Sequence, residues 1–333
     1  MSDVARAAGV SLGTVSNALN KPEIVSDRTR ERVQAAIEKL GFVRNDAARS
    51  LAAGSSRTIG LVLTDVGNSL FVDIARGAEQ AATEAGHALL LANSDVDFKK
   101  QESYLDIFDE ARVAGILLAP LDASLEGVDR VRSHGRRIVL VNYAGDRADC
   151  CSVLVDEEHG GYLAAKHLID LGRRRLVFAG GPENLRAVND RRRGARRAVA
   201  EEAGRVSLEI VIGRSLNSPE GRRIAGDLAS RGRSHLPDGI IAPSDQLAAG
   251  MIHELTAVYG LRVPQDVAVI GYDNNQFATE GAIPLSTIGQ PGHEMGRVAT
   301  KLLLEEAAES TGHEHRVLML EPNLIARQST VGR

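Results

Sequence analysis

The sequence predicts an N-terminal all-α segment followed by an α/β core of two lobes, each built on a doubly wound parallel sheet. Two observations support this order. Apolar residues recur at helical spacing through residues 1–40, whereas short apolar runs typical of buried strands alternate with amphipathic stretches from Thr58 onward. With 333 residues, 43% hydrophobic and 25% charged, the chain has room for two or three domains. We expect a head over 1–43, a hinge helix and linker over 44–57, and the core over 58–333.

The head is predicted to hold three helices around a small apolar core. In the first helix Val4, Ala5 and Ala8 share one face, and Gly9 then breaks the helix. Ser11 is placed to cap a second helix that runs to residue 20, because its side chain can accept a hydrogen bond from the next turn. A third helix is expected over 26–40, with Val33, Ala36, Ile37 and Leu40 as its buried stripe.

The second helix leaves a small polar edge outside the head's core. This edge consists of Leu12, Gly13, Thr14, Ser16 and Asn17. A helix, a glycine turn and a second helix form the helix-turn-helix arrangement, which places the second helix in the major groove of DNA. Asn17 can pair with adenine or donate to guanine, whereas the hydroxyls of Ser11, Thr14 and Ser16 suit phosphates. Helix capping is the alternative role for Ser11 and Thr14.

The segment RNDAARSLAAG, residues 44–54, reads as one short helix with Asn45 at its start and Gly54 at its end. Isolated helices shorter than about 12–15 residues are marginal in water, so a partner surface must fold it. Leu51 is the large apolar residue that it offers. Packing on the core as a linker residue is the alternative role for Leu51.

The core alternates apolar runs with helical stretches. Strands are expected in TIGLVLTD, HALLLANSD, AGILLAP and RIVLVNY, and then in RRLVFAGG, SLEIVIG, GIIAPSD and VAVIGYDN. Helices are expected in FVDIARGAEQAATEAG, ESYLDIFDEAR, GYLAAKHLIDLG, RRRGARRAVAEEAG and QLAAGMIHELTAVYG. Open parallel sheets bind ligands outside the carboxyl ends of their strands, so two facing lobes should enclose one small molecule.

Candidate ligand-binding residues, most of them polar or aromatic, follow several predicted strands. They are Asn68, Leu70, Phe71, Asn142, Asp245 and Asp273. Their polar groups can hydrogen-bond a ligand, and Phe71 can offer it an apolar face. Helix capping is the alternative for Asp245 and Asp273, because short acidic residues often take that role.

Long stretches of the chain resemble the LacI/GalR family of bacterial transcriptional regulators. They are DVARAAGVSLGTVSNALN, VSDRTRERVQAAIEKLGFVRNDAARSL, TIGLVLTDVGNSLF, VDEEHGGYLAAKHLIDLG, GLRVPQDVAVIGYDN and PLSTIGQP, in family order. The resemblance implies that Leu12, Gly13 and Asn17 read bases and that Leu51 is a wedge in the minor groove. It also implies that the hinge residues Asn45, Ala48 and Arg49 contact DNA. The sequence departs from the family at Arg44, where Pro is common, and at Ala52, where a basic residue is common.

The same resemblance implies a core similar to periplasmic sugar-binding proteins. It places an N-lobe at about 58–157 plus 289–318 and a C-lobe at about 158–288 plus 319–333, with Arg191 as an effector-binding residue. The implied protein is a homodimeric repressor of palindromic operator DNA, controlled by a small effector, with a carbohydrate as the first expectation. Asn142 stands where the family usually has Asp. A nucleoside- or nucleobase-responsive regulator, and a cytoplasmic sugar-binding module without a regulatory role, are the alternatives.

Charge and composition narrow the class of protein. Residues 1–57 carry nine Lys and Arg against six Asp and Glu, whereas the rest carries 31 against 38, so a basic head precedes an acidic body. No apolar run approaches the roughly 20 residues of a membrane span and no secretory signal is seen, so we expect a cytoplasmic protein without membrane contact. The adjacent Cys150 and Cys151 are poorly placed for a disulfide.

Enzymatic function is not expected. The chain has no G-x-G-x-x-G after a strand, no P-loop and no nucleophile elbow, and it suggests no cofactor. Its nine histidines are scattered. His313 and His315 fall in a polar loop, and the sequence predicts no metal site.

Overall fold

The computed structural model describes residues 1–42, 56–121, 125–143, 147, 149–308 and 312–332. These residues form two compact units, Met1–Ser56 and Arg57–Arg333, which we describe separately. Among the described residues, no helix combines the length and the apolarity that a membrane crossing requires.

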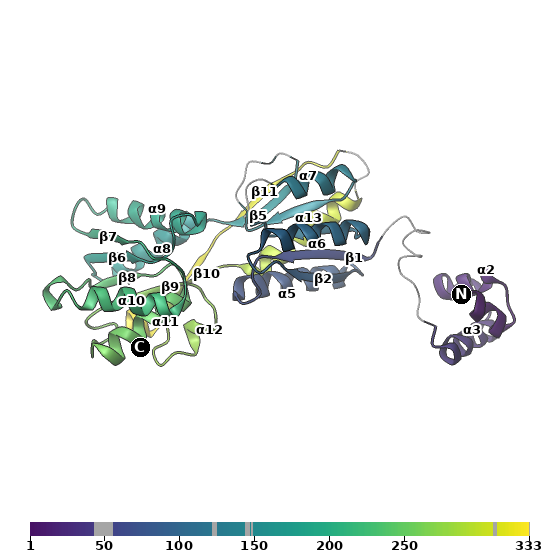
Figure 1. Cartoon of the computed structure of the whole chain (residues 1–333), viewed down its shortest axis with the longest axis horizontal. Coiled ribbons are helices and arrows are strands. Elements are labelled where there is room, and N and C mark those ends of the chain that lie inside the picture. The colour runs from purple at the N-terminus through teal and green to yellow at the C-terminus, as the bar shows by residue number, and fades with distance from the viewer. Residues whose placement is uncertain (43–55, 122–124, 144–146, 148, 309–311, 333) are drawn as a thin grey trace. The chain divides into compact units, whose positions relative to one another are not determined.

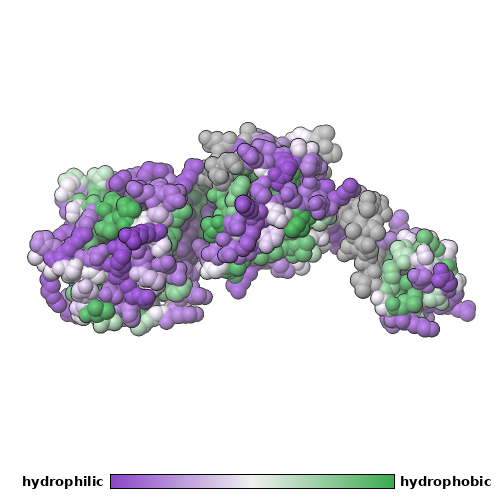
Figure 2. All heavy atoms as spheres, viewed as in Figure 1, coloured by the Kyte–Doolittle hydropathy of each residue, from purple (hydrophilic) through white to green (hydrophobic). Residues whose placement is uncertain are grey.

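The head consists of three helices and one 3₁₀ turn. Their bounds are α1 Ser2–Ala8, α2 Leu12–Asn20, η1 Pro22–Ile24 and α3 Asp27–Leu40. Val4, Ala5, Ala8, Val15, Val33 and Ala36 form its buried core. The prediction for Leu40 was wrong: it is 46% exposed, because it ends α3 just before Gly41 turns the chain with a left-handed φ of 56°. Figure 2 shows that hydrophobic residues also reach the surface of the head.

The N-lobe is a six-stranded sheet with helices on both faces (Figure 1). Its strands are β1 Thr58–Leu63, β2 Ala88–Asn93, β3 Gly115–Leu118, β4 Ile138–Val141, β5 Cys151–Val155 and β11 Val317–Leu320. Its helices are α5 Ser69–Glu84, α6 Phe98–Glu110, α7 Glu126–Ser133 and α13 Gly292–Ala308. The order is β11-β5-β4-β3-β1-β2, and all the paired strands are parallel.

The C-lobe repeats this order as β12-β10-β9-β8-β6-β7. Its strands are β6 Arg175–Ala179, β7 Ser207–Val211, β8 Gly239–Ile241, β9 Ala268–Asp273, β10 Ser286–Gly289 and β12 Asn323–Ile325. Its helical elements are α8 Glu157–Asp170, α9 Arg186–Ala200, α10 Ser218–Ala229, η2 Arg233–His235, α11 Asp245–His253, η3 Glu254–Val258, α12 Gln276–Thr279 and α14 Gln328–Val331. In contrast to β11, the last strand β12 is antiparallel to its neighbour β10.

Small residues bring helix pairs very close in both lobes. In the N-lobe α5 packs against α13, and a Cβ on Gly77 would overlap the backbone carbonyl oxygen of His293. In the C-lobe α8 packs against α9, and a Cβ on Gly194 would overlap the carbonyl oxygen of Glu158. Both contacts therefore require glycine for steric reasons.

The predicted architecture is confirmed, with additions at the ends of the lobes. All eight predicted strands form, but β5, β10, β11 and β12 were not predicted as strands. The expected lobe borders at 288/289 and 318/319 fall inside β10 and β11, because a strand stays in one sheet along its whole length. Three crossings therefore join the lobes, between β5 and α8, between β10 and α13, and between β11 and β12.

Candidate functional site

The exposed edge of α2 carries the predicted DNA-reading residues. Ser11 is the N-cap, and its Oγ accepts a hydrogen bond from the Thr14 backbone N–H at 3.1 Å. Leu12 is 51% exposed although it is a large apolar residue, and Gly13 and Asn17 are also exposed. Ser16 is half-buried and accepts a hydrogen bond from the Asn20 side chain at 3.3 Å. The capping role of Ser11 is therefore present, and the outward residues Leu12, Gly13 and Asn17 of α2 remain accessible.

Arg32 fixes the turn that presents α2. Its Nη2 donates to the carbonyl oxygens of Ala8 at 2.5 Å and of Gly9 at 3.2 Å, where α1 ends. Gly9 adopts a left-handed φ of 63°, which favours glycine. Arg32 is exposed, and its guanidinium satisfies carbonyls that the end of a helix leaves unpaired.

The hinge candidates Asn45, Ala48, Arg49 and Leu51 lie outside the described residues.

In the C-lobe, Arg191 from α9 is buried and makes an ion pair, a backbone hydrogen bond and a cation–π contact. It makes a two-point ion pair with Glu157, with Nε–Oε2 at 2.8 Å and Nη2–Oε1 at 2.9 Å. Its Nη1 donates to the Pro243 carbonyl at 2.7 Å, and its guanidinium lies 3.7 Å from the centroid of the Tyr272 ring. Burial by itself lowers the pKa of Arg191, but the adjacent Glu157 carboxylate raises it above its ordinary value.

Asp273 ends β9 beside Arg191, with Oδ1 and Nη2 3.9 Å apart. Its φ of 103° is rare for a non-glycine residue. Gln290, in the crossing between β10 and α13, donates its Nε2 to Asp273 Oδ1 at 2.7 Å. Burial raises the pKa of Asp273 to about 6, although the positive charge of Arg191 opposes this shift. The predicted effector residues Arg191 and Asp273 are thus brought together.

Asp245 is fully buried at the start of α11. Its Oδ1 accepts from the Thr287 hydroxyl at 2.6 Å and its Oδ2 accepts from the Asn275 backbone N–H at 2.8 Å. Burial, and next the negative charge of Asp273, raise the pKa of Asp245 to about 8. The N-cap of α11 is Ser244, so the capping alternative for Asp245 was wrong by one residue.

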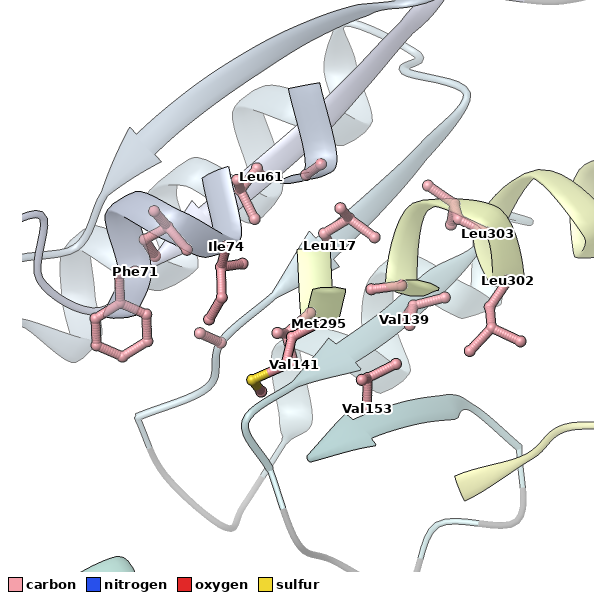
Figure 3. Packing of buried hydrophobic residues seen from close by; sticks show 14 of the residues in the cluster. Leu61, Phe71, Ile74, Leu117, Val139, Val141, Val153, Met295, Leu302 and Leu303 are labelled. Atoms are coloured by element: carbon pink, nitrogen blue, oxygen red, sulfur yellow. The ribbon is translucent and has the colours of Figure 1, made fainter. Parts of the chain in front are cut away.

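The N-lobe candidates occupy a different environment. Asn68 caps α5 by accepting the Leu70 N–H at 3.0 Å. Leu70 and Phe71 are buried, and Figure 3 shows Phe71 beside Ile74 in the packed N-lobe core. Only the remaining 8% of Phe71 is accessible to solvent, so its apolar face is mostly used by the core.

Asn142 lies at a cavity of about 400 Å³ between the lobes. Its φ is 56°, and its backbone N–H donates to the Val153 carbonyl at 2.8 Å. The cavity is lined by Asn142, Leu154, Val155, Asp156, Glu157, Glu158, Arg186, Ala187, Asp190, Arg193, Arg197 and Met319. It adjoins the buried network through Glu157. Another cavity of about 450 Å³ lies by Arg175 and Ser207, at the opposite ends of β6 and β7 from the predicted ligand edge.

The sequence pattern did not predict a role for Glu157 or Gln290. Glu157 lies in the stretch VDEEHGG, but its partner Arg191 is 34 residues away, and the choice between Glu157 and Glu158 depends on the rotation of α8. Gln290 contacts Asp273 only because β9 and β10 pair in parallel. The contacts of both residues therefore depend on the tertiary structure and not on local sequence spacing.

Comparisons with known proteins agree with this architecture. Residues 1–45 match the family described as bacterial regulatory proteins, lacI family, and residues 165–330 match a periplasmic binding protein-like domain. The chain is 31% identical over 332 residues to HTH-type transcriptional repressor PurR of Aliivibrio fischeri (strain MJ11). The aligned region covers 99% of this chain and 98% of that protein. It is 32% identical over 328 residues to PurR of Vibrio campbellii (strain ATCC BAA-1116), with 98% and 97% covered.

Solved structures match over the same length. A transcriptional regulator CelR–cellobiose complex is 28% identical, with a TM-score of 0.71 and 98% of each chain covered. The lac repressor dimer bound to operator and the anti-inducer ONPF has the same fold, with a TM-score of 0.84 at 24% identity and 98% of each chain covered. The helical head, the two-lobed α/β core and the full-length likeness to PurR lead to one conclusion: the chain belongs to the lacI family of bacterial regulatory proteins and is a DNA-binding transcriptional regulator.

Proposed function

We propose that this protein is a transcriptional repressor that binds a palindromic operator as a homodimer and responds to a small molecule bound between its lobes. The observation that carries the proposal is the accessible outer edge of α2, where a large apolar residue, Leu12, and an amide able to pair with a base, Asn17, lie on the surface. Full-length likeness to repressors named PurR supports the sign of regulation.

The head is assigned to operator recognition. Asn17 contacts a base edge, Leu12 contacts thymine methyl groups, and Gly13 lets the backbone approach the groove. The hydroxyls of Ser11, Thr14 and Ser16 contact phosphates, which set position rather than sequence. In the hinge, Leu51 opens a central base step while Asn45, Ala48 and Arg49 lie along the minor groove. A two-fold dimer then pairs two heads with two half-sites.

The effector site is assigned to the cleft edge of the C-lobe together with Asn142. We propose a nucleobase or nucleoside as the effector, because the full-length relatives are named PurR. The buried acceptors suit a ligand rich in N–H donors: Gln290 Oε1 is buried without a hydrogen-bond partner among the described residues, beside the Asp273 carboxylate. A carbohydrate is the second candidate, supported by the cellobiose complex of the 28% identical regulator.

Gln290 offers a route from this site to the movement of the lobes. It lies in a crossing between the lobes, and its amide holds Asp273 of the C-lobe while the next helix, α13, packs on α5 of the N-lobe. A ligand that takes over Asp273 releases this contact and changes the relative angle of the lobes. Such coupling is reciprocal, so operator DNA must change ligand affinity by the same factor that ligand changes DNA affinity.

The first experiment selects duplexes from a random DNA pool with the purified protein near physiological salt, because non-specific phosphate contacts are then partly screened. We expect enrichment of a palindrome. Asn17→Ala should relax the preference at one base pair of each half-site, at a cost of about 1–3 kcal/mol per site. Enrichment of a DNA sequence without two-fold symmetry contradicts operator binding by a homodimer.

The second experiment tests the division of labour between hinge and cleft. Leu51→Ala should weaken operator binding and leave ligand affinity unchanged, with Ser50→Ala as the neighbouring control. Asp273→Asn should abolish the response to ligand and leave operator binding intact.

Calorimetry with adenine, guanine, hypoxanthine, their nucleosides, cellobiose and ribose identifies the ligand class. Binding of sugars alone moves the second candidate to first place, and a ligand without any effect on operator affinity contradicts the proposed coupling.

A further inference from the structure

One cluster of potential metal ligands lies away from the cleft, at the amino ends of β5 and β11. Cys151 begins β5, and His313 and His315 precede β11 in the neighbouring segment. Cys151 Sγ lies 3.3 Å from His313 Nε2 and 3.8 Å from His315 Nδ1, and the three potential ligand atoms all lie within 4.8 Å of one another. Cys151 is buried, and both histidines are half-buried.

Strand pairing explains why these side chains meet. β11 runs parallel to β5 with Val317 opposite Ser152, so the residues just before Val317 lie beside Cys151. The Arg316 backbone N–H points at Cys151 Sγ from 3.4 Å, which fixes this register. Side chains two residues apart along an extended segment point to the same side, so His313 and His315 approach the sulfur together. Their rings are inclined at 73° with centroids 5.1 Å apart.

The two sulfur–nitrogen distances are close to those of a tetrahedral zinc site, and a small movement of the histidine side chains would bring all three ligand atoms around one ion. With a Zn–S bond of about 2.3 Å and Zn–N bonds of about 2.0–2.1 Å, tetrahedral angles separate sulfur from nitrogen by about 3.5–3.6 Å. The two observed separations, 3.3 and 3.8 Å, lie on either side of that value. Thiolate sulfur and imidazole nitrogen are also the donor types that zinc prefers. Three protein ligands would leave one position for water.

The surroundings suit a cation. Glu306 is buried, and its Oε2 has no hydrogen-bond partner among the described residues. The nearby cations are balanced: Arg132 pairs with Asp149 at 3.4 Å and Glu306 at 3.6 Å, and Arg316 pairs with Glu305.

We propose that Cys151, His313 and His315 form a zinc site in the N-lobe. The ion would replace the thiol proton of Cys151 and join two segments that are 162 residues apart in sequence. β5 and β11 each lead from their carboxyl ends into a crossing to the C-lobe, so bound zinc would join the amino ends of the two strands that precede these crossings. The sequence predicted no metal site, because neither the Cys nor the His-x-His pair has a recognisable zinc spacing by itself.

The alternative is a neutral thiol that exchanges ordinary hydrogen bonds with the two imidazoles. Burial raises the pKa of Cys151, so without a metal the sulfur keeps its proton. Both arrangements bring the same atoms together, and only the thiolate–metal bond distinguishes them.

Cobalt(II) is the probe, since a cysteine thiolate bound to cobalt gives a charge-transfer absorption in the near ultraviolet. The full chain, stripped with a chelator, is titrated with Co²⁺ and then with Zn²⁺. We expect one equivalent of cobalt to produce the band and one equivalent of zinc to remove it. The control is Cys150→Ser, because Cys150 is also a buried thiol but belongs to the hydrophobic cluster on the other face of the sheet.

Substitutions of the three proposed ligands test whether they bind the metal. Cys151→Ser should abolish the band, and His313→Ala or His315→Ala should weaken metal affinity at least about 10-fold, since even residues that only support metal ligands typically contribute 10–100-fold. Zinc should raise the Tm of the parent chain and of Cys150→Ser, but not of the double histidine variant. The proposal is overturned if no band forms, if the band survives Cys151→Ser, or if Cys150→Ser removes it equally. Should Cys151→Ser fail to fold by circular dichroism, the half-buried histidine variants carry the test.

Discussion

The N-lobe and the C-lobe repeat one strand order but place different chemistry at the carboxyl ends of their strands. In the N-lobe, Asn68 caps α5 and Phe71 joins the apolar core. In the C-lobe, a buried ion pair of Arg191 and Glu157 adjoins Asp273. The same apolar framework therefore supports a helix cap and an apolar side chain in one lobe and a buried charged network in the other. A few residues on a shared scaffold, rather than the scaffold, set the chemistry of each edge.

The largest effect should come from breaking the charged network. Arg191→Met leaves the carboxylates of Glu157 and Asp273 buried without their cation, and we expect the free energy of unfolding to fall by about 3–5 kcal/mol. Denaturant unfolding of the full chain measures it. The double variant Arg191→Met/Glu157→Met should recover part of the loss. A loss in the free energy of unfolding below about 1 kcal/mol would mean that the buried charged network contributes little to the stability of the C-lobe.

The next effect is a pH dependence that originates in the C-lobe. The pKa of Asp245 is raised to about 8 in the folded protein, so the folded state binds its proton more tightly than the unfolded state. Stability from this group is therefore present near pH 5 and is lost as pH rises towards 8, by roughly 2–4 kcal/mol. Asp245→Asn should flatten this part of the profile in unfolding experiments at pH 5, 6, 7 and 8. Identical slopes for the parent and the variant would contradict the burial of a titrating carboxyl here.

The third prediction tests where the lobes should behave alike. Gly77→Ala in the N-lobe and Gly194→Ala in the C-lobe each force a Cβ against a backbone carbonyl, and we expect each to cost about 1–3 kcal/mol. Gly226→Ala is the control, because a Cβ there meets nothing closer than 3.6 Å and alanine favours the helix. Thermal unfolding compares the three. A large loss in only one lobe would show that the two helix contacts are not equivalent.

The smallest effect should come from an exposed ion pair of the N-lobe. Arg130 bridges Glu102 at 3.1 Å and Asp106 at 2.8 Å, and its side chain is 40% exposed. Because solvent screens such pairs, Arg130→Ala should cost less than about 1 kcal/mol in the same unfolding assay. If Arg130→Ala lowers the free energy of unfolding as much as Arg191→Met does, exposed and buried ion pairs contribute equally to the stability of this protein.

Periodicity alone determined most of the fold. The head helices, the eight strands named from apolar runs and the paired lobes follow from spacing, because burial of one face imposes a period on the sequence. Strands β5, β10, β11 and β12 were not predicted. β11 and β12 have partly exposed patterns that depend on the edge of the sheet they join, and a lobe border cannot be located until that choice is made.

The candidate residues show the same division. Sequence position placed Arg191, Asp245 and Asp273 near strand and helix ends. Only the folded chain decided that Glu157 rather than Glu158 binds Arg191, that Gln290 holds Asp273, and that Phe71 packs inward. It also brought Cys151 to His313 across 162 residues. Side-chain partners distant in sequence depend on strand register and helix rotation, which local spacing does not contain.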